Sequence, residues 1–401
     1  MILKPFPFQI QLRDFFKKQS KTWNWFATPT VMHEQAEAFK TDLLKNVYRI
    51  DADAEPQIYE VLNKAKDKLG IIIPVTIYQS QAYDGNNASI VFFDNEAHII
   101  LSGSILKLLT NDELLALLAH ELSHILLYNT ENREFEITNN IINAIANDNH
   151  SELFYHETAR LYQLYTELYC DLGALKVCED LHTVIGTLVK LHTGLDKVSA
   201  ESYLKQADEI LERTEKGAKG ETHPEIFIRA KSLQMFQNEP ATYYEKIGKL
   251  VIGKNNLQQL NLFSKTEIYN FTKQLVDIVL KPKWTQSEYC IALYRQYFTD
   301  FKVNSNVMIT QELKDSIDNS EENLKDYFAY VMLDFALCDA DLKEPFLGLI
   351  LDLGEQLNLA NNLKNCIKKE LKLTDKQFKD SSLKYAAELN QILESEQEKT
   401  Y

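Results

Sequence analysis

The feature that most constrains this chain is a long apolar stretch, residues 111–128, with two histidines and a glutamate near its centre. Its leucines and isoleucine cover most of the circumference of the helix that the pattern predicts, so we expect this helix to be buried. His120 and His124 lie four residues apart, and an α-helix therefore places them side by side on one face. Glu121 lies about 100° further round the helix, because one turn takes roughly 3.6 residues.

Two imidazoles at this spacing can hold one zinc ion. The carboxylate of Glu121 can then reach a water on that ion without binding the metal itself. Metal-assisted hydrolysis needs this arrangement of two nitrogen ligands, an open coordination position and an adjacent general base. A five-residue motif also arises by chance. However, a buried helix must satisfy its three polar groups, and a metal does so directly. The stretch therefore predicts one Zn²⁺ per chain and a hydrolase.

Composition restricts the alternatives. A chain of 401 residues can form two or three domains with sizeable cores. The net charge of −15 argues against nucleic acid as a partner, because phosphate binding needs basic patches. The five cysteines are scattered and lack CxxC spacing, which favours a reducing compartment over a disulfide framework. We find no signal-peptide pattern and no run of about 18 apolar residues, so we expect a soluble cytoplasmic protein without a membrane span.

The hydrophobic pattern predicts a mainly α fold in three parts. Residues 1–54 form a helical lead segment, residues 55–236 an α+β domain around the metal motif, and residues 237–401 an all-helical C-terminal domain. Short β-rich runs before the metal helix predict a small sheet, with strands at residues 74–79, 88–93 and 97–101. Helices are predicted at residues 9–18, 32–47, 57–69, 137–146 and 156–178. The helix at 137–146 belongs to an insertion, residues 130–158, which is either a lid or a static spacer.

A catalytic zinc usually takes three protein ligands and one water. The pattern HExxHxxGxxH is excluded, because Leu127 and Thr130 stand where it requires Gly and His. A glutamate about a score of residues further on is disfavoured, since position 143 is Asn. A better candidate is Glu167, on the helix predicted at 156–178. Asp171 follows one turn later on the same face, where a carboxylate can orient a zinc-bound imidazole. A solvated acidic face is the alternative interpretation of these two residues.

Four ordered elements carry a family resemblance: the HELSH helix, the ExxxD pair of Glu167 and Asp171, Thr222-His223-Pro224, and Arg229. In this order they resemble the soluble catalytic part of HtpX-like zinc endopeptidases, a family that includes the CAAX prenyl-protein endopeptidases. The family usually has Ala where this chain has Cys170, a small-for-small change. The likeness covers about residues 55–233 and implies a catalytic domain of the zincin type.

By that resemblance, Glu167 is the third zinc ligand beside His120 and His124, and Asp171 supports the ligands from behind. His223 and Arg229 would line the site and stabilise the oxyanion of a tetrahedral intermediate. The sequence His223-Pro224 is also typical of a helix start with proline at its first position.

The family also places an Asn-Ala pair at the start of the strand before the zinc helix, and Asn87-Ala88 fits this pattern. The strand at 88–93 would then be the edge on which an extended peptide lies, with Asn87 holding its backbone. A plain turn asparagine is the other interpretation. The best-known members are integral membrane proteins, whereas this chain has no predicted span. We therefore expect soluble unfolded or regulatory proteins as substrates.

The region near residues 320–395 resembles TerB-like helical domains and has an acidic turn with Asp339, Asp341 and Glu344. This region is either a module that binds a metal or a protein partner, or a structural lid. The rival to the enzyme is a catalytically silent scaffold whose structural zinc has His156 or His223 as a fourth ligand. A latent protease, covered by its insertion or C-terminal half, is a third interpretation.

Overall fold

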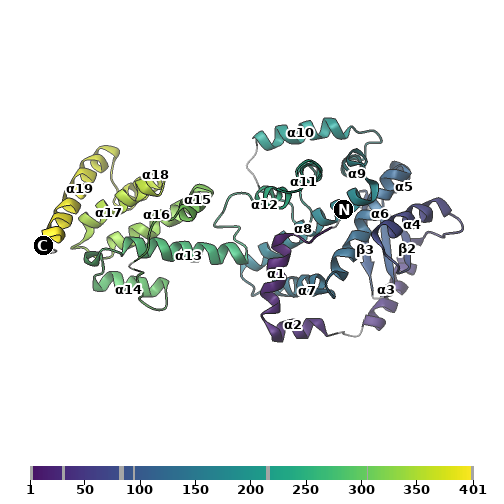
Figure 1. Ribbon diagram of the computed structural model, residues 1–401, viewed down its shortest axis with the longest axis horizontal. Coiled ribbons are helices and arrows are strands. Elements are labelled where there is room, and N and C mark those ends of the chain that lie inside the picture. Colours follow the sequence, from purple (N-terminus) through teal and green to yellow (C-terminus); the bar gives the residue numbers. More distant parts are fainter. Residues whose placement is uncertain are drawn as a thin grey trace. The chain divides into compact units, whose positions relative to one another are not determined.

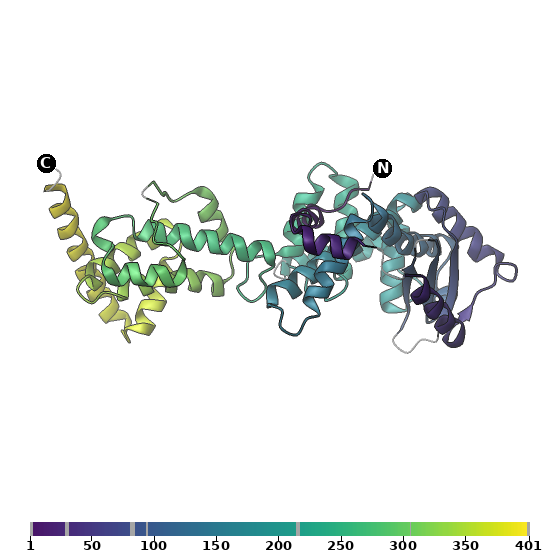
Figure 2. The same cartoon turned by 90° about the horizontal axis from the view of Figure 1, so that it is seen from below.

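The computed structural model describes residues 3–28, 32–80, 85–93, 95–213, 217–304 and 306–398. The chain divides into two compact units, Met1–Gly253 and Lys254–Tyr401. Among the described residues, all four strands lie in the first unit, and the second unit is helical (Figures 1 and 2). The prediction of a mainly helical chain with a small sheet is confirmed. The predicted functional boundary near residue 236 stays a prediction.

The first unit has twelve α-helices in its described part. They are α1 (Pro7–Lys17), α2 (Ser20–Ala27), α3 (Met32–Asn46), α4 (Pro56–Leu69), α5 (Ile105–Leu108), α6 (Asn111–Asn129), α7 (Glu134–Ala146), α8 (Leu153–Cys178), α9 (Leu181–Thr193), α10 (Ala200–Arg213), α11 (Ile226–Asn238) and α12 (Tyr243–Ile252). Its strands are β1 (Tyr48–Arg49), β2 (Val75–Ser80), β3 (Asn87–Phe92) and β4 (Ala97–Ser102).

The four strands form one sheet in the order β1-β2-β4-β3. Strands β2 and β4 are parallel, while β3 runs antiparallel to β4, with Asn87 opposite Ser102 and Phe92 opposite Ala97. Strand β3 is therefore an edge strand, and it lies against helix α6. The three predicted strands form within a residue of their expected ends. Strand β1 was not predicted, because two residues are too few to show an alternating pattern.

Helix α6 begins with a capping box. The hydroxyl of Thr110 accepts a hydrogen bond from the backbone N–H of Glu113, and the Glu113 carboxylate accepts one from the Thr110 N–H at 2.8 Å. Such a reciprocal cap satisfies two of the free amides at a helix start. The same carboxylate lies 2.9 Å from Nζ of Lys190 on α9. Glu113 therefore fixes both the first turn of the metal helix and its position against α9.

Helices α6 and α8 approach each other closely at Gly173. A Cβ atom at this position would lie 2.6 Å from Cβ of Ser123 on α6, and closer still to its hydroxyl oxygen. The hydroxyl of Ser123 is itself turned inward and donates to the Ala119 carbonyl. Because Gly173 has no side chain of its own, α8 can approach α6 closely enough to bring its polar residues within reach of the histidines.

The lead segment and the insertion both pack onto this helix pair. Leu12 and Phe16 of α1 are buried, as is Phe6 just before it, and Nε2 of Gln9 donates to the hydroxyl of Thr166 on α8. On α7, the insertion contributes buried Phe135, whose carbonyl accepts a hydrogen bond from a tyrosine of α8 at 2.7 Å. Helix α7 therefore packs with one face on this helix pair, while its other face, with Asn140, Asn143 and Ala144, is exposed.

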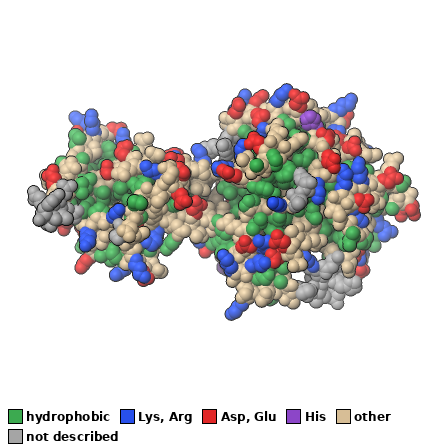
Figure 3. All heavy atoms as spheres, in the orientation of Figure 1, with side chains coloured by type: hydrophobic (Ala, Val, Ile, Leu, Met, Phe, Trp, Pro, Cys, Tyr) green, Lys and Arg blue, Asp and Glu red, His purple; other side chains and the backbone are tan. Residues whose placement is uncertain are grey.

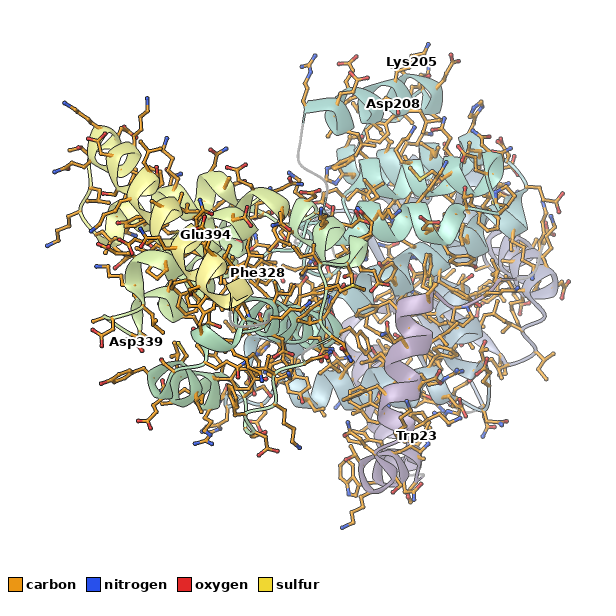
Figure 4. All side chains as sticks on the ribbon, turned by 60° about the vertical axis from the view of Figure 1, so that its left-hand side comes forward. Trp23, Lys205, Asp208, Phe328, Asp339 and Glu394 are labelled. Carbon is orange, nitrogen blue, oxygen red and sulfur yellow. The ribbon has the colours of Figure 1, made fainter. Side chains whose placement is uncertain are left out.

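The second unit is built from α13 (Leu262–Val279), a 3-10 helix at Lys283–Thr285, α14 (Glu288–Tyr297), α15 (Gln311–Asp318), α16 (Glu322–Leu337), α17 (Lys343–Gln356), α18 (Ala360–Glu370) and α19 (Asp375–Glu398). Its core is aromatic and aliphatic, and Figure 4 shows Phe328 among the helices of this unit. Helices α16 and α17 flank the acidic turn that the sequence indicates.

The acidic turn between α16 and α17 is satisfied within the unit. Oδ1 of Asp339 accepts a hydrogen bond from the backbone N–H of Asp341 at 3.0 Å, and Figure 4 labels Asp339 at this turn. The carboxylate of Glu344 lies 2.6 Å from Nζ of Lys384 on α19. These contacts show that the acidic turn is part of the packing of this unit. The TerB-like character of residues 320–395 stays a prediction.

The surface is of mixed charge. On the face of the molecule in Figure 3, acidic and basic side chains are interspersed, with apolar side chains between them. That face therefore shows no continuous basic patch of the kind that binds nucleic acid. Among the helices of the described residues, none has both the length and the hydropathy that a membrane crossing requires.

The contact at Gly173 gives a test of the α6–α8 packing. We expect Gly173→Ala to destabilise the first unit by about 1–3 kcal/mol, because the added methyl group forces the two helices apart. Gly186→Ala on α9 is the matched control. Its nearest atoms would lie 3.8 and 3.9 Å away, so alanine should be neutral or stabilise the helix by about 1 kcal/mol. Calorimetric unfolding of both variants would measure this, and equal midpoints would contradict the packing argument.

Candidate metal centre

The site forms where the middle of α6 faces the middle of α8. Nε2 of His120 lies 3.2 Å from Oε2 of Glu167, and Nε2 of His124 lies 3.8 Å from Oε1 of the same carboxylate. The centroids of the two imidazole rings are 5.5 Å apart. The structure therefore brings together the three side chains that the sequence and the family resemblance suggested as metal ligands.

The other ring nitrogen of His120 is held from behind. Its Nδ1 lies 3.0 Å from Oδ1 of Asp171, and a carboxylate only accepts hydrogen bonds, so Nδ1 carries the proton. Asp171 is in turn bound by Arg229, whose Nε and terminal nitrogen donate to the two carboxylate oxygens at 2.8 and 2.6 Å. This chain from Arg229 through Asp171 fixes the ring orientation of His120 and directs Nε2 toward Glu167.

The position of Arg229 bears on its predicted role. Its side chain is buried, and two of its nitrogens already donate to Asp171. These bonds favour an orienting role over direct contact with a substrate. The role of Arg229 as an oxyanion stabiliser stays a prediction.

His223 lies on the open side of the site. Its Nε2 is 3.3 Å from Oε2 of Glu167, and half of its side chain is exposed. Its Nδ1 lies 2.9 Å from the hydroxyl of Thr222. Pro224 is not at the first helical position, because helix α11 starts at Ile226 with Glu225 as its N-cap. The expected helix start is thus displaced by two residues, yet His223 still lies beside the paired imidazoles.

The unpaired oxygen of Glu167 shows that the residues present fit a cation. Oε1 of this carboxylate accepts a hydrogen bond from Nε2 of Gln163 at 3.1 Å. Oε2 is buried and accepts no hydrogen bond among the described residues, although two imidazole nitrogens lie near it. A buried charged oxygen that accepts no hydrogen bond is costly. A divalent ion held by the two imidazoles and this oxygen would remove that cost.

The pKa values of the residues around Glu167 also favour a cation at this place. Burial opposes ionisation of Glu167, but the neighbouring imidazoles of His120 and His124 hold its pKa below the usual range. Burial also opposes protonation of His120, yet Asp171 and Glu167 together raise the pKa of His120 to about 10. The space between Nε2 of His120 and Glu167 therefore attracts a positive charge, either a proton or a metal ion.

Cys170 is a further candidate ligand that the sequence did not reveal. Its sulfur and the nitrogens of His120 and His124 all lie within 4.8 Å of one another. Cys170 follows Glu167 by three residues, and this helical spacing is the signal that could have indicated it. Burial and the nearby carboxylates raise the pKa of its thiol well above the usual value. A thiol must lose its proton to bind a metal, whereas Glu167 is already ionised, and its role as the third ligand stays a prediction.

Glu121 occupies a different position from the ligand set. It is buried, and burial raises the pKa of its carboxyl group to about 7. It lines a cavity of about 770 Å³ together with His120, His223 and the edge-strand residues Asn87 and Ala88. A carboxyl group with this pKa beside a metal centre can accept a proton near neutral pH and later return it.

The fourth ligand suggested for a structural zinc is not found at His156. This residue is exposed on α8, eleven positions before Glu167. At 1.5 Å per residue the two are about 16 Å apart along the helix axis. His223 is the one of the two rival ligands that lies next to the site.

Comparison with known proteins finds a family model that matches this part of the chain. Residues 52–237 match the model of peptidase family M48. This range includes the capped helix α6, the polar residues of α8, and His223 with Arg229. The M48 match supports a metallopeptidase, in agreement with the resemblance to HtpX-like and CAAX-type proteases. No curated protein and no solved structure matches the chain.

The choice between Glu167 and Cys170 as third ligand can be tested by metal content. Glu167→Gln should lose most of the bound zinc, because it removes the ionised oxygen between the imidazoles. Cys170→Ala should keep it, since a protonated thiol contributes little to binding. Elemental analysis of both purified variants after dialysis would measure the difference. Zinc loss from the cysteine variant together with retention in the glutamine variant would reverse the assignment.

Proposed function

We propose that residues 52–237 form a zinc-dependent endopeptidase, with one zinc ion held by His120, His124 and Glu167. The observation that carries this proposal is the buried Oε2 of Glu167, which accepts no hydrogen bond from the described residues and lies beside the imidazoles of His120 and His124. These residues lie in the range that matches peptidase family M48. Three ligands leave one coordination position for water or substrate, as hydrolytic zinc sites require. When bound, the ion would polarise a peptide carbonyl and make the attacking water more acidic.

Glu121 is proposed as the general base. Its carboxylate takes a proton from the attacking water and passes it to the nitrogen of the leaving amine. The burial that raises the pKa of Glu121 to about 7 makes both transfers feasible near neutral pH. Asp171 and Arg229 hold the ring of His120 during these steps, because their hydrogen bonds fix its Nδ1 proton.

His223 is proposed to stabilise the oxyanion. It is half exposed at the edge of the site, and its Nε2 lies near the metal-facing oxygen of Glu167. A donor in this position can hydrogen-bond an oxygen that gains negative charge in the transition state. Arg229 would assist indirectly, since its guanidinium group is bound to Asp171.

The edge strand β3 is proposed to bind the substrate backbone. The N–H of Ala88 donates to Oδ1 of Asn87 at 3.0 Å, and both residues line the same cavity as Glu121. A peptide lying along β3 could replace this local bond with its own carbonyl group, while the Asn87 amide binds the peptide backbone. Binding along a strand suits internal segments of a peptide, which favours an endopeptidase.

The general-base assignment predicts the behaviour of Glu121→Gln. This variant should keep its zinc, because Glu121 is not a ligand, and should lose hydrolysis by about 10²–10⁴-fold. Digestion of casein by the zinc-loaded protein would measure the loss, with elemental analysis of the same sample as the control. Chelator treatment of the wild type should abolish digestion, and added zinc should restore it. Full proteolysis by a zinc-loaded glutamine variant would rule out the mechanism.

A further inference from the structure

The cavity beside Glu121 continues into an apolar wall that the reaction itself does not use. On α9, the residues that line the cavity follow the spacing i, i+3, i+4 and i+7, so one face of this helix points into it. These residues are Val184, Thr187, Leu188 and Leu191. Leu117 lies one turn before Glu121 on the same face of α6 and adjoins this wall.

Two further elements close the wall. Tyr203 on α10 and Phe227 on α11 line the same cavity, and both side chains are half-buried. Helix α9 packs against α6, α10 and α11, so the four helices surround one space. Its volume of about 770 Å³ lies within the range of about 300–1,000 Å³ that is typical of ligand pockets.

The described charged residues that line the cavity include no cationic side chain of the Lys or Arg type that is available to a substrate. Among the described lining residues there is no lysine, and the arginine, Arg229, is neutralised by Asp171. Glu225 accepts a hydrogen bond from the backbone N–H of Lys219 at 2.9 Å through one oxygen, and its other oxygen is buried. Among the described lining residues, an acidic substrate side chain or a chain-terminal carboxylate would therefore find no lysine and no unpaired arginine.

We propose that this wall selects a large aliphatic or aromatic side chain next to the scissile bond, with Leu188, Leu191 and Phe227 as its specificity-determining residues. The proposal rests on the proposed peptidase function and names its substrate class. The general base lies one helical turn, about 5.4 Å, from the start of the wall. A side chain adjacent to the attacked carbonyl can therefore reach the wall while the backbone stays on β3.

Matched peptides would test the selection. We expect peptides with Leu or Phe at this position to be cleaved by the zinc-loaded protein roughly ten- to a hundredfold faster, in kcat/KM, than peptides with Asp or Gly. Leu191→Asp should reduce this preference and favour Lys or Arg instead. Leu195→Asp is the matched control, because Leu195 is exposed and does not line the cavity. Mass spectrometry of the cleavage sites in casein would give an independent record.

These experiments distinguish failure of the proposed side-chain preference from failure of the proposed peptidase function. Hydrolysis without apolar preference, or a preference that Leu191→Asp leaves unchanged, would overturn the selection and leave the peptidase intact. If no hydrolysis occurs, the same peptides can be titrated against Glu121→Gln by fluorescence anisotropy. Tighter binding of the Leu and Phe peptides would then support the selection without the peptidase, and equal binding of all peptides would refute it.

A second inference concerns the other unit and is independent of the peptidase. Sγ of Cys290 lies 3.2 Å from Sγ of Cys338, although the two residues are 48 positions apart. Cys290 is buried in the first turn of α14, and its backbone N–H is capped by the hydroxyl of Ser287. Cys338 directly follows α16 and is half-buried. The hydrogen bond between the two thiols lowers the pKa of one of them, Cys290, and raises that of the other.

We infer that Cys290 and Cys338 are a disulfide-forming pair that responds to peroxide. One of the two sulfurs attacks hydrogen peroxide, an S–O bond forms, the O–O bond breaks, and the first water leaves. The other sulfur then attacks the oxidised one and releases the oxygen as a second water. Two thiols are oxidised and one peroxide is reduced, and the product joins the start of α14 to the end of α16.

Peroxide treatment of the full chain would test this pair. We expect two free thiols to be lost, a peptide containing both cysteines in non-reducing maps, and a midpoint of unfolding of this unit higher by roughly 5–15 °C. Cys338→Ser should abolish all three effects. Cys366→Ser should leave them unchanged, because Cys366 is buried elsewhere in the unit. Retention of all thiols, or a disulfide with another cysteine, would refute the inference.

Discussion

Three carboxyl groups are buried between α6 and α8, and the rest of the first unit must balance their charge. Glu121, Glu167 and Asp171 face a single guanidinium, that of Arg229. Removing such charges from water costs several kcal/mol each unless they are paired. Arg229 balances Asp171, and burial favours the neutral form of Glu121. One oxygen of Glu167 accepts no hydrogen bond among the described residues, so a cation beside His120 would stabilise the fold as well as create a reactive centre.

Much of this arrangement depends on local rules, and those parts were predictable. A buried helix with two histidines four residues apart presents both on one face, whatever surrounds it. The turn at Gly70, the short alternating strands and the long helix of residues 156–178 likewise follow from patterns within ten to twenty residues. For these reasons the mainly helical fold with its small sheet could be predicted from the sequence.

Contacts between distant residues were not predictable in the same way. Glu167 was suggested by family resemblance, and only the packing of α8 on α6 shows that it lies near His120. That packing depends on Gly173 opposite Ser123, which no periodic pattern indicates. The pair Cys290 and Cys338 has no sequence signal either, because their proximity results from the tertiary packing of α14 and α16.

The two sides of the cavity impose different requirements on a substrate of the proposed peptidase. The edge of β3 can pair only with an extended segment, which a folded protein rarely exposes. The wall of α9 favours a large apolar side chain, and such residues are mostly buried in folded proteins. Both together are met by unfolded chains, because these expose extended backbone and core side chains at once. The cavity would therefore discriminate by the folding state of the substrate more than by its sequence.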